Sequence, residues 1–440
     1  MDSWFDRSAA GRSLNWIAAA PVRLLAPIAR GKELRLGSAP GCAALLSAGC
    51  ALMLCVPHPC WNNLYGVLFA AVLLVLYWWD CAARGLDVLP PSELGWGLWV
   101  FLGMCVVCSL RAAYPAGSFR VAAFYFAGAV LCYVAAAAGR ETCPDRVLFP
   151  WIYAALLFTA VYGLWVYLRG GDVYGVPMGD RIVPRLGSTL EHAINYSEFA
   201  AMALPLCLVW AARRPKRRQR LALLVPLLLP CAALALTYAR TGWLALAAAV
   251  LVLLICWDVR LLIPAAGLGV LGLLLLPSDI KSRLFSMLTW TNSSASGRFV
   301  LWRECFAVLR QHWIGGVGLG PENFYHAYLP FSTGLLDFQP PHANMGYLEI
   351  FLSLGVLGFV GFLFFFFRVF PRLRRGVAAG SPGGRWELIA LAASLTGAAV
   401  ANIPEHLWFY PRILFFWCVL WGTALGRTTD DALRSDRGDA

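Results

Sequence analysis

The chain has 440 residues, of which 60% are hydrophobic and only 14% are charged. An ordinary globular protein has about a quarter of its residues charged. Long apolar runs recur along most of the sequence, as they do in a polytopic membrane protein. The composition therefore excludes a soluble enzyme and an intrinsically disordered chain, and it argues against a nucleic-acid partner for the net charge of +12.

The first 35 residues carry short apolar patches that are interrupted by Arg23 and Arg30. Interspersed charges of this kind are typical of an amphipathic helix that lies on a membrane surface. They argue against a signal peptide, which needs an uninterrupted apolar core and a cleavage motif. We therefore predict a cytoplasmic amphipathic segment at residues 1–35.

The apolar runs that follow predict an all-α protein with about 12 transmembrane helices. A spanning helix needs about 20 mostly apolar residues. The predicted spans are 36–57, 61–80, 92–110, 121–138, 147–168, 192–211, 221–239, 241–257, 261–277, 345–367, 387–404 and 408–426. They divide the chain into membrane helices 1–9 at 36–277, a long loop at 278–344, membrane helices 10–12 at 345–426, and a tail at 427–440.

The basic residues decide the predicted orientation. One side of the membrane collects 24 of the 36 Lys and Arg, and the other side holds 12, five of them in the loop 278–344. Long loops cross the membrane regardless of charge, so the fair comparison is 24 against 7, and the richer side is cytoplasmic. The densest run, 213–220, is accordingly a cytoplasmic loop. Both termini are predicted inside, and the loop 278–344 is predicted to be extracytoplasmic.

Most of the 14 Cys lie within the apolar spans, where a cysteine acts as a small hydrophobic residue. Cys60 and Cys305 are the main candidates for a disulfide on the outer side. Cys105 and Cys108 form a C-x-x-C pair, but they lie inside a span, so we predict no redox or metal role for them.

The long outer loop is predicted to contain a helix over 297–309. Its apolar residues recur at spacings of three and four, and Ser294 or Ser296 is expected to cap its start. The glycine-rich run 315–321 then ends the helix. A nucleotide-binding interpretation of this run fails, because Pro321 stands where a G-x-G-x-x-G motif needs its third glycine. A second, shorter outer loop is predicted at 169–188.

Ionisable residues at the outer ends of spans are candidates for chemistry, because charge near a membrane is expensive. Glu191, His192 and Asn195 lie within one predicted helical turn and are expected to share a face. The alternative is a polar helix start that Ser188 or Thr189 caps. Asn195 lies deeper and is expected to form a hydrogen bond inside the bundle.

Three arginines on the outer side are further candidates. Arg240 lies between two apolar runs with almost no loop, so a tight helix break would hold it at the outer membrane face. Its alternative is to snorkel toward lipid headgroups. Arg298 and Arg303 lie in the loop helix, five residues apart and therefore on different faces, and either could simply be solvated.

His342 begins the tenth span from the outside, and Glu349 lies two turns deeper on about the same face. A lone histidine at a helix start is usually a polar cap residue, but this one faces the same compartment as the arginines. Arginine binds phosphate and stays charged, and histidine accepts protons near neutral pH. This combination favours a membrane-embedded diphosphate substrate, with an acceptor that histidine deprotonates.

Four segments, in this order, resemble the O-antigen ligase and polymerase family of bacterial membrane glycosyltransferases. They are Arg185-Leu-Gly-Ser-Thr with Asn195, Thr237-Tyr-Ala-Arg240-Thr-Gly242, Gly297-Arg298 with Trp302 and Gly316-Val-Gly318-Leu-Gly320, and His342-Ala-Asn344 with Tyr347-Leu348-Glu349 and Gly355-Val-Leu-Gly358. The likeness covers about 185 to 360. The second segment departs from the family pattern, because Ala239 and Thr241 stand where serine and glycine are usual.

The resemblance implies an inverting glycosyl transfer that needs no metal or cofactor, at the extracytoplasmic face of the bacterial inner (cytoplasmic) membrane. The donor would be a glycan on undecaprenyl diphosphate, and the acceptor would be another glycan or lipid A–core. By motif match, Arg185, Arg240 and Arg298 would bind the diphosphate and His342 would be the base, with Asn195, Asn344 and Glu349 in supporting roles.

The motifs leave open whether the acceptor makes the chain a ligase, a polymerase or a protein-glycosylating relative. A twelve-helix secondary transporter is the alternative function, and a scaffold for polysaccharide export is a weaker one. Transporters tend to have repeated halves and a site at the membrane midplane. The sequence shows no repeat, and its polar candidates gather at one face, so it favours the glycosyltransferase.

Overall fold

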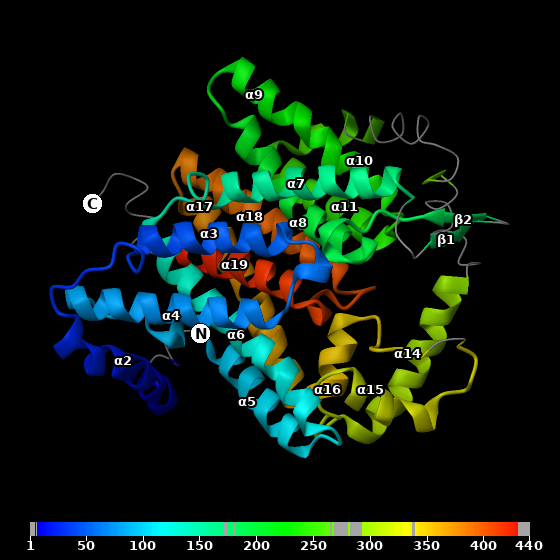
Figure 1. Ribbon diagram of the computed structural model, residues 1–440, viewed down its shortest axis with the longest axis horizontal. Helices are drawn as coiled ribbons and strands as arrows, with labels where there is room; N and C mark the ends of the chain where they lie inside the picture. The colour runs from blue at the N-terminus through cyan, green and yellow to red at the C-terminus, as the bar shows by residue number, and fades with distance from the viewer. Residues whose placement is uncertain are drawn as a thin grey trace.

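The computed structural model describes residues 5, 7–170, 175–178, 181–264, 266–267, 280–281, 293–336 and 339–429. These residues form a bundle of α-helices with one small hairpin (Figure 1). The α-helices are α2 (Ala9–Ala29), α3 (Ala39–Cys55), α4 (Leu64–Arg84), α5 (Trp96–Arg111), α6 (Pro115–Glu141), α7 (Leu148–Leu168), α8 (Ala193–Ala212), α9 (Arg217–Leu224), α10 (Leu228–Leu236), α11 (Arg240–Trp257), α14 (Ser293–His312), α15 (Pro321–Tyr328), α16 (Gly346–Phe367), α17 (Val369–Ala379), α18 (Pro382–Ala401) and α19 (Pro411–Arg427). The strands are β1 (Gly175–Met178) and β2 (Arg181–Pro184), and short 3-10 helices lie at His58–Cys60, Pro91–Leu94, Ser188–Leu190, Val225–Leu227, Val259–Leu261, Leu329–Phe331 and Leu407–Phe409.

The predicted all-α membrane architecture is confirmed. Seven helical stretches in the described part of the chain are long and apolar enough to cross a membrane, and α3 and α5 are shorter apolar helices. Each predicted span except the ninth coincides with a helix or a pair of helices. Most of the ninth, 261–277, lies outside the described residues, so the number of spans stays a prediction.

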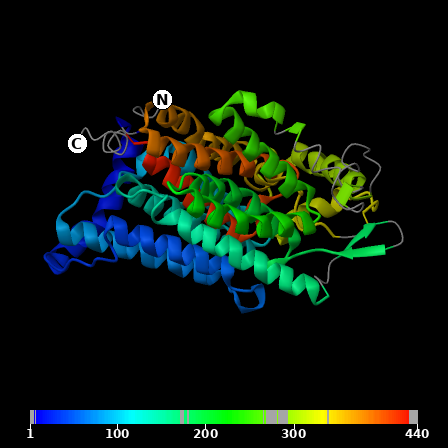
Figure 2. The same cartoon turned by 90° about the horizontal axis from the view of Figure 1, so that it is seen from above.

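The centre of the bundle is α19, in which every residue is buried. Figure 2 shows this helix with neighbours on several sides. It packs closely along α6: a Cβ atom on Gly422 would lie 2.3 Å from the carbonyl oxygen of Cys132. Small residues allow such close approach of helix backbones in membranes, where packing rather than water exclusion drives association.

The seventh predicted span, 221–239, is not one continuous helix. It consists of α9, a 3-10 turn at Val225–Leu227, and α10. Pro226 lies in this turn, and a proline provides no backbone N–H for an α-helical hydrogen bond. The predicted amphipathic segment at the N-terminus contains α2, which packs beside α4, where the indole N–H of Trp79 donates to the Lys32 carbonyl at 3.0 Å.

The helix predicted at 297–309 is longer in the structure, where it forms α14. Since α14 begins at Ser293, Ser294 and Ser296 lie inside its first turn, and the prediction that one of them precedes and caps the helix is wrong. The apolar side of α14 includes Leu301, Cys305 and Val308, which are buried against α15 and α16. In the described part of the chain no cysteine, Cys305 and Cys60 included, forms a disulfide bond.

The glycine-rich run after α14 clasps a kink in α16. At Gly355 the helix is interrupted by a left-handed residue with φ of 66°. This opening lets Val317 N–H donate to Leu352 O at 2.9 Å and Gly318 N–H donate to Ser353 O at 3.0 Å. In the other direction, Val356 N–H donates to Trp313 O at 2.7 Å. The predicted role of the glycines, a turn with close backbone packing, is therefore confirmed, and the clasp ties the long loop to the bundle.

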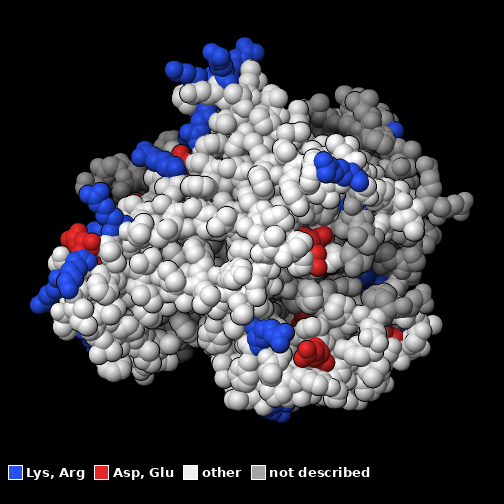
Figure 3. Space-filling model, in the orientation of Figure 1, with Lys and Arg blue, Asp and Glu red and all other residues white. Residues whose placement is uncertain are grey.

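The shorter outer loop contains an antiparallel hairpin that the sequence analysis did not predict. Gly175 pairs with Pro184, and Met178 pairs with Arg181. Figures 1 and 2 both show the hairpin projecting from the end of the bundle near α14, which we call the loop end. The opposite end, where α17 lies, we call the basic end. In Figure 3 the blue Lys and Arg atoms gather toward the basic end.

The close backbone packing at Gly355 predicts that adding a single methyl group there lowers the stability of the protein. In Gly355→Ala the added Cβ would lie 2.1 Å from Ile314 O, on a residue whose φ is positive. Left-handed backbone at a non-glycine residue costs about 1–3 kcal/mol before any clash. We expect a clearly lower thermal unfolding midpoint for the detergent-solubilised protein. Gly103→Ala in α5 is the control, since its Cβ meets no atom within 4 Å, and equal midpoints for the two variants would contradict the clasp.

Candidate functional site

Arg185 and Arg240 meet at the break between α10 and α11. Arg185 follows β2, and its Nε–H donates a hydrogen bond of 2.7 Å to the carbonyl oxygen of Thr237 in the break. Arg240 is the first residue of α11. Tyr238, with φ of 50°, turns the chain sharply between the two helices. The predicted tight break is therefore present, and it brings two arginines from different segments to the loop end.

Arg298 reaches the same place from α14. Its guanidinium donates to the carboxylate of Glu405, which lies in the connection between α18 and α19. The charges of Arg298 and Arg185 both act on Glu405, and the charge of Arg298 also acts on Arg240. These three arginines, Arg185, Arg240 and Arg298, form what we call the arginine cluster. Burial raises the pKa of Glu405, while the positive charges of Arg298 and Arg185 oppose this rise.

His342 lies in a turn that is clamped on both sides. The backbone N–H of Ala343 donates to the buried carboxylate of Glu349 at 2.8 Å, and the indole N–H of Trp302 donates to Ala343 O at 3.0 Å. The backbone N–H of Asn344 donates to Nδ1 of His342 at 3.1 Å. Glu349 and Trp302 thus hold the backbone of the turn, and Asn344 orients the ring.

The environment of His342 strongly favours the neutral imidazole. Burial, and then the positive charge of Arg298, lower the pKa of His342 to about 3. Because Nδ1 accepts the Asn344 hydrogen bond, the neutral ring carries its hydrogen on Nε2. The ring lies 4.4 Å from the ring of Phe409 and 5.5 Å from that of His406, measured between centroids. His342 therefore lies close both to Arg298 and to the connection that leads into α19.

The residues at the start of α8 are arranged differently from the prediction. The helix begins at Ala193, so Glu191 and His192 precede it and do not share a helical face with Asn195. Glu191 has φ of 72° and pairs with His58 at 3.2 Å. The amide of Asn195 donates to Leu190 O at 2.9 Å, which gives Asn195 the expected buried hydrogen bond but a local one.

The alternative prediction, a side-chain cap at the start of α8, is also wrong. Ser188 donates to Thr159 O and Thr189 donates to Leu54 O, each at 2.7 Å or less, so both hydroxyls join neighbouring helices instead. Arg303 is exposed on α14 and has no part in the arginine cluster.

Glu405 and His406 were missed by the sequence analysis. Both are buried in the connection between α18 and α19, which is fixed to the start of α16 because Gly346 N–H donates to Asn402 O and to Glu405 O at 3.0 and 2.9 Å. The available signal was their position: two adjacent ionisable residues in the few residues between the predicted spans 387–404 and 408–426.

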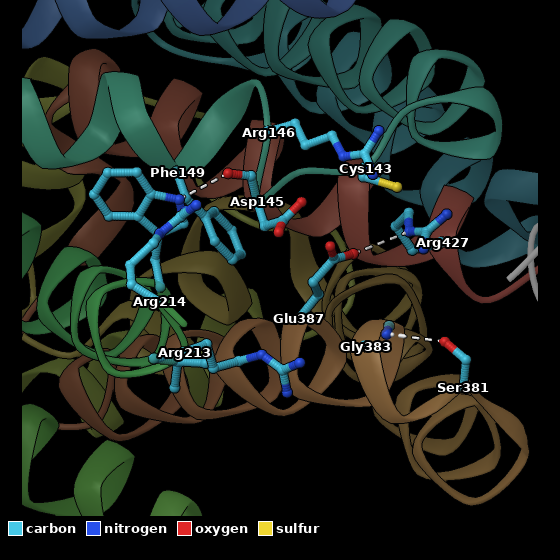
Figure 4. Close-up of a pocket in the computed structure, with 13 residues that line it drawn as sticks. Cys143, Asp145, Arg146, Phe149, Arg213, Arg214, Ser381, Gly383, Glu387 and Arg427 are labelled. Atoms are coloured by element: carbon cyan, nitrogen blue, oxygen red, sulfur yellow. Dashed lines mark hydrogen bonds and ion pairs between the residues drawn. The ribbon is translucent and has the colours of Figure 1, made fainter. Parts of the chain in front are cut away.

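A separate polar cavity of about 270 Å³ lies at the basic end (Figure 4). Four arginines line it, and one of them, Arg427, pairs with the buried Glu387 at 3.4 Å. Atoms of Cys143, Asp145 and Glu387 that could bind a metal lie within 4.8 Å of one another. The surrounding guanidinium groups oppose a cation there by charge. None of the candidate residues from the sequence lines this cavity, so we place the candidate site at the loop end.

Residues 225–363 match the family model described as O-antigen ligase. The chain therefore carries an O-antigen ligase domain. This match confirms the family resemblance. No match is found among curated proteins.

The O-antigen ligase domain includes Arg240, Arg298, His342 and Glu349. Arg185 and Glu405 lie outside the matched residues, on opposite sides in sequence, and the fold brings them to the same group of charges. At this point the loop end combines three arginines, a neutral histidine and a buried carboxylate. Such a group can bind a polyphosphate through its guanidinium groups and accept a proton on its neutral imidazole.

The ion pair between Arg298 and Glu405 predicts non-additive effects on stability. Removing one partner of a buried pair strands the other charge, at a cost of about 3–5 kcal/mol when burial is complete. We expect Arg298→Ala and Glu405→Ala each to lower the thermal unfolding midpoint, and the double variant to lose less than the sum of the two. Arg303→Ala, which removes an exposed arginine from the same helix, is the control. Additive losses would show that the pair contributes no coupling.

Proposed function

We propose that this chain is a membrane glycosyltransferase that moves a glycan from undecaprenyl diphosphate to an acceptor hydroxyl. The observation that supports this best is the convergence of Arg185, Arg240 and Arg298 beside His342 at the loop end. Three of these four residues lie in the O-antigen ligase domain. The position at one end of the bundle suits a substrate whose lipid stays in the membrane while its glycan projects from it.

In the proposed reaction the arginine cluster holds the diphosphate. The acceptor oxygen attacks the anomeric carbon of the donor sugar, and the bond from that carbon to the phosphate oxygen breaks with its electron pair. The leaving undecaprenyl diphosphate gains negative charge, which guanidinium groups stabilise through charge-assisted hydrogen bonds. Because the arginines provide this positive charge, the proposed reaction needs no metal. Glu405 occupies one guanidinium in the structure, and a phosphate would compete for it.

His342 receives the proton of the acceptor hydroxyl. In the structure the lone pair of Nδ1 accepts from Asn344 N–H, so proton transfer to the ring requires this hydrogen bond to open. Bound diphosphate would also favour this proton transfer, because its negative charge offsets the positive charge of Arg298 and stabilises the imidazolium form of His342. The donor would therefore raise the basicity of His342 when it binds. Glu349, Trp302 and Asn344 position the histidine and do not themselves meet the reacting atoms.

The proposal places this chemistry at the extracytoplasmic face of a bacterial inner membrane, with both termini in the cytoplasm. The acceptor is a hydroxyl of a second lipid-linked glycan or of lipid A–core, and surrounding lipids solvate the bundle. A transporter would hold its polar groups near the membrane midplane. The polar candidates lie instead at helix ends and in connections, which favours a reaction at the surface over transport.

Loss of the base or of one arginine should stop transfer. A well-placed general base contributes about 10²–10⁴-fold to rate, so we expect His342→Ala to lower kcat at least about 100-fold. Arg240→Ala should lower kcat/KM similarly, and Arg240→Lys should recover part of it, since lysine keeps the charge without the planar fork. Consumption of lipid-linked glycan by purified, monodisperse protein is the measurement. Full activity in both alanine variants would refute the proposal, and Arg303→Ala should match the wild type.

The low pKa of His342 predicts a particular pH dependence. Only the neutral ring accepts a proton, so activity rises as pH increases through the pKa of His342. In the protein without donor this pKa is about 3, and bound diphosphate raises it. The acid limb of kcat should therefore lie at higher pH than the acid limb of kcat/KM for the donor, and Arg298→Gln should move the latter upward. If the acid limbs of kcat and kcat/KM lie at the same pH, and Arg298→Gln does not shift them, this role for His342 is contradicted.

A further inference from the structure

A small cavity of about 170 Å³ lies close to His342, and none of the three arginines of the arginine cluster lines it. It is enclosed by α6, α16, the glycine-rich run and the connection into α19. Pro341, the neighbour of His342, forms part of its wall. Four aromatic side chains line it: Phe124, Tyr125, Trp408 and Phe409.

Two buried polar groups in the wall have no partner in the part of the chain that the structure describes. His406 is only 9% exposed, and neither of its ring nitrogens has a hydrogen-bond partner. The indole N–H of Trp408 is likewise buried and unpartnered. Buried polar groups are nearly always hydrogen-bonded, so each exception asks for an explanation. Both residues line the same cavity, which is the place from which a ligand could supply the missing partners.

The chemistry of these groups selects neutral hydroxyls. Burial lowers the pKa of His406, so its ring is neutral. A neutral imidazole offers one donor and one acceptor, and an indole offers one donor. A sugar hydroxyl complements both groups because it donates and accepts. No Lys or Arg lines the cavity, whereas Glu349 does, so its lining suits an uncharged ligand better than a phosphate.

The position of the cavity relates it to the reaction. The centroids of the His342 and His406 rings are 5.5 Å apart, and Arg298 acts on His342 from the arginine cluster. In an inverting transfer the acceptor approaches the sugar carbon from the side opposite the leaving diphosphate. A cavity that lies close to the base, and whose lining includes none of the three arginines, fits this requirement.

We infer that this cavity is the binding site for the acceptor sugar, and that His406 and Trp408 hold its hydroxyl groups beside His342. The inference rests on the proposed glycosyltransferase function, and it adds the location of the acceptor-binding site. The aromatic walls pack against the apolar face of the sugar ring, as in other mostly apolar pockets with a few converging polar groups.

The test compares variants that remove one polar group and keep the ring. His406→Phe and Trp408→Phe are measured against His312→Phe and Trp313→Phe, which remove the same groups from α14 and the residue after it, outside the cavity. Initial rates are recorded with the acceptor varied at saturating undecaprenyl-diphosphate glycan, and then with the donor varied at saturating acceptor. Acceptors are lipid A–core without O antigen and a lipid-linked repeat unit, each used alone.

The loss of one hydrogen bond weakens binding by about 3- to 10-fold. We expect His406→Phe and Trp408→Phe to raise the acceptor KM by this factor and to leave the donor KM unchanged. His406→Gln, which keeps a donor and an acceptor, should recover part of the loss, and the two α14-region controls should match the wild type.

An unchanged acceptor KM in both cavity variants, or a rise in the donor KM instead, would overturn the inference. A rise in the control variants equal to that in the cavity variants would also overturn it. These outcomes differ from failure of the proposed function, in which His342→Ala itself would retain transfer.

Discussion

The clasp between the glycine-rich run and the kink of α16 is the constraint on which the loop end depends. An unbroken α16 would use the carbonyls of Leu352 and Ser353 within the helix, but the left-handed Gly355 frees them for Val317 and Gly318. Polar backbone groups inside a membrane protein need a partner, so the two interruptions satisfy each other. As a result α14 is fixed relative to α16, and Trp302 on α14 can reach the turn that carries His342.

The arginines of the loop end serve different purposes, which their sequence context alone does not separate. Arg412 is buried in α19 and donates to the carbonyls of Met53, Val56 and Thr189, so it joins three segments of the bundle. Arg298 pairs with a carboxylate that other arginines also influence. A surplus of positive charge around one acidic group is costly unless an anion shares it. The arginine cluster thus suits the proposed phosphate binding, whereas the hydrogen bonds of Arg412 stabilise the fold.

The sequence predicted the helices and the tight break at Arg240 because apolar length and the near absence of a loop are local properties. It also predicted the helix in the outer loop and the glycine turn, but not the clasp, since the kink at Gly355 depends on distant backbone partners at Trp313, Val317 and Gly318. The start of α8 was predicted wrongly because Glu191 takes a positive φ that allows it to pair with His58. Glu405 and His406 belong to a connection whose importance appears only when α14 and α16 fold against it.

The central claim is that a lipid diphosphate binds at the loop end, and a structure of the protein with undecaprenyl diphosphate in a lipid nanodisc tests it most directly. The account predicts phosphate oxygens within about 2.7–2.9 Å of the guanidinium nitrogens of Arg240 and Arg298, with Arg298 released from Glu405. A diphosphate bound instead in the cavity at the basic end, among Arg146, Arg213 and Arg214, with the ion pair of Arg298 and Glu405 intact, would contradict it.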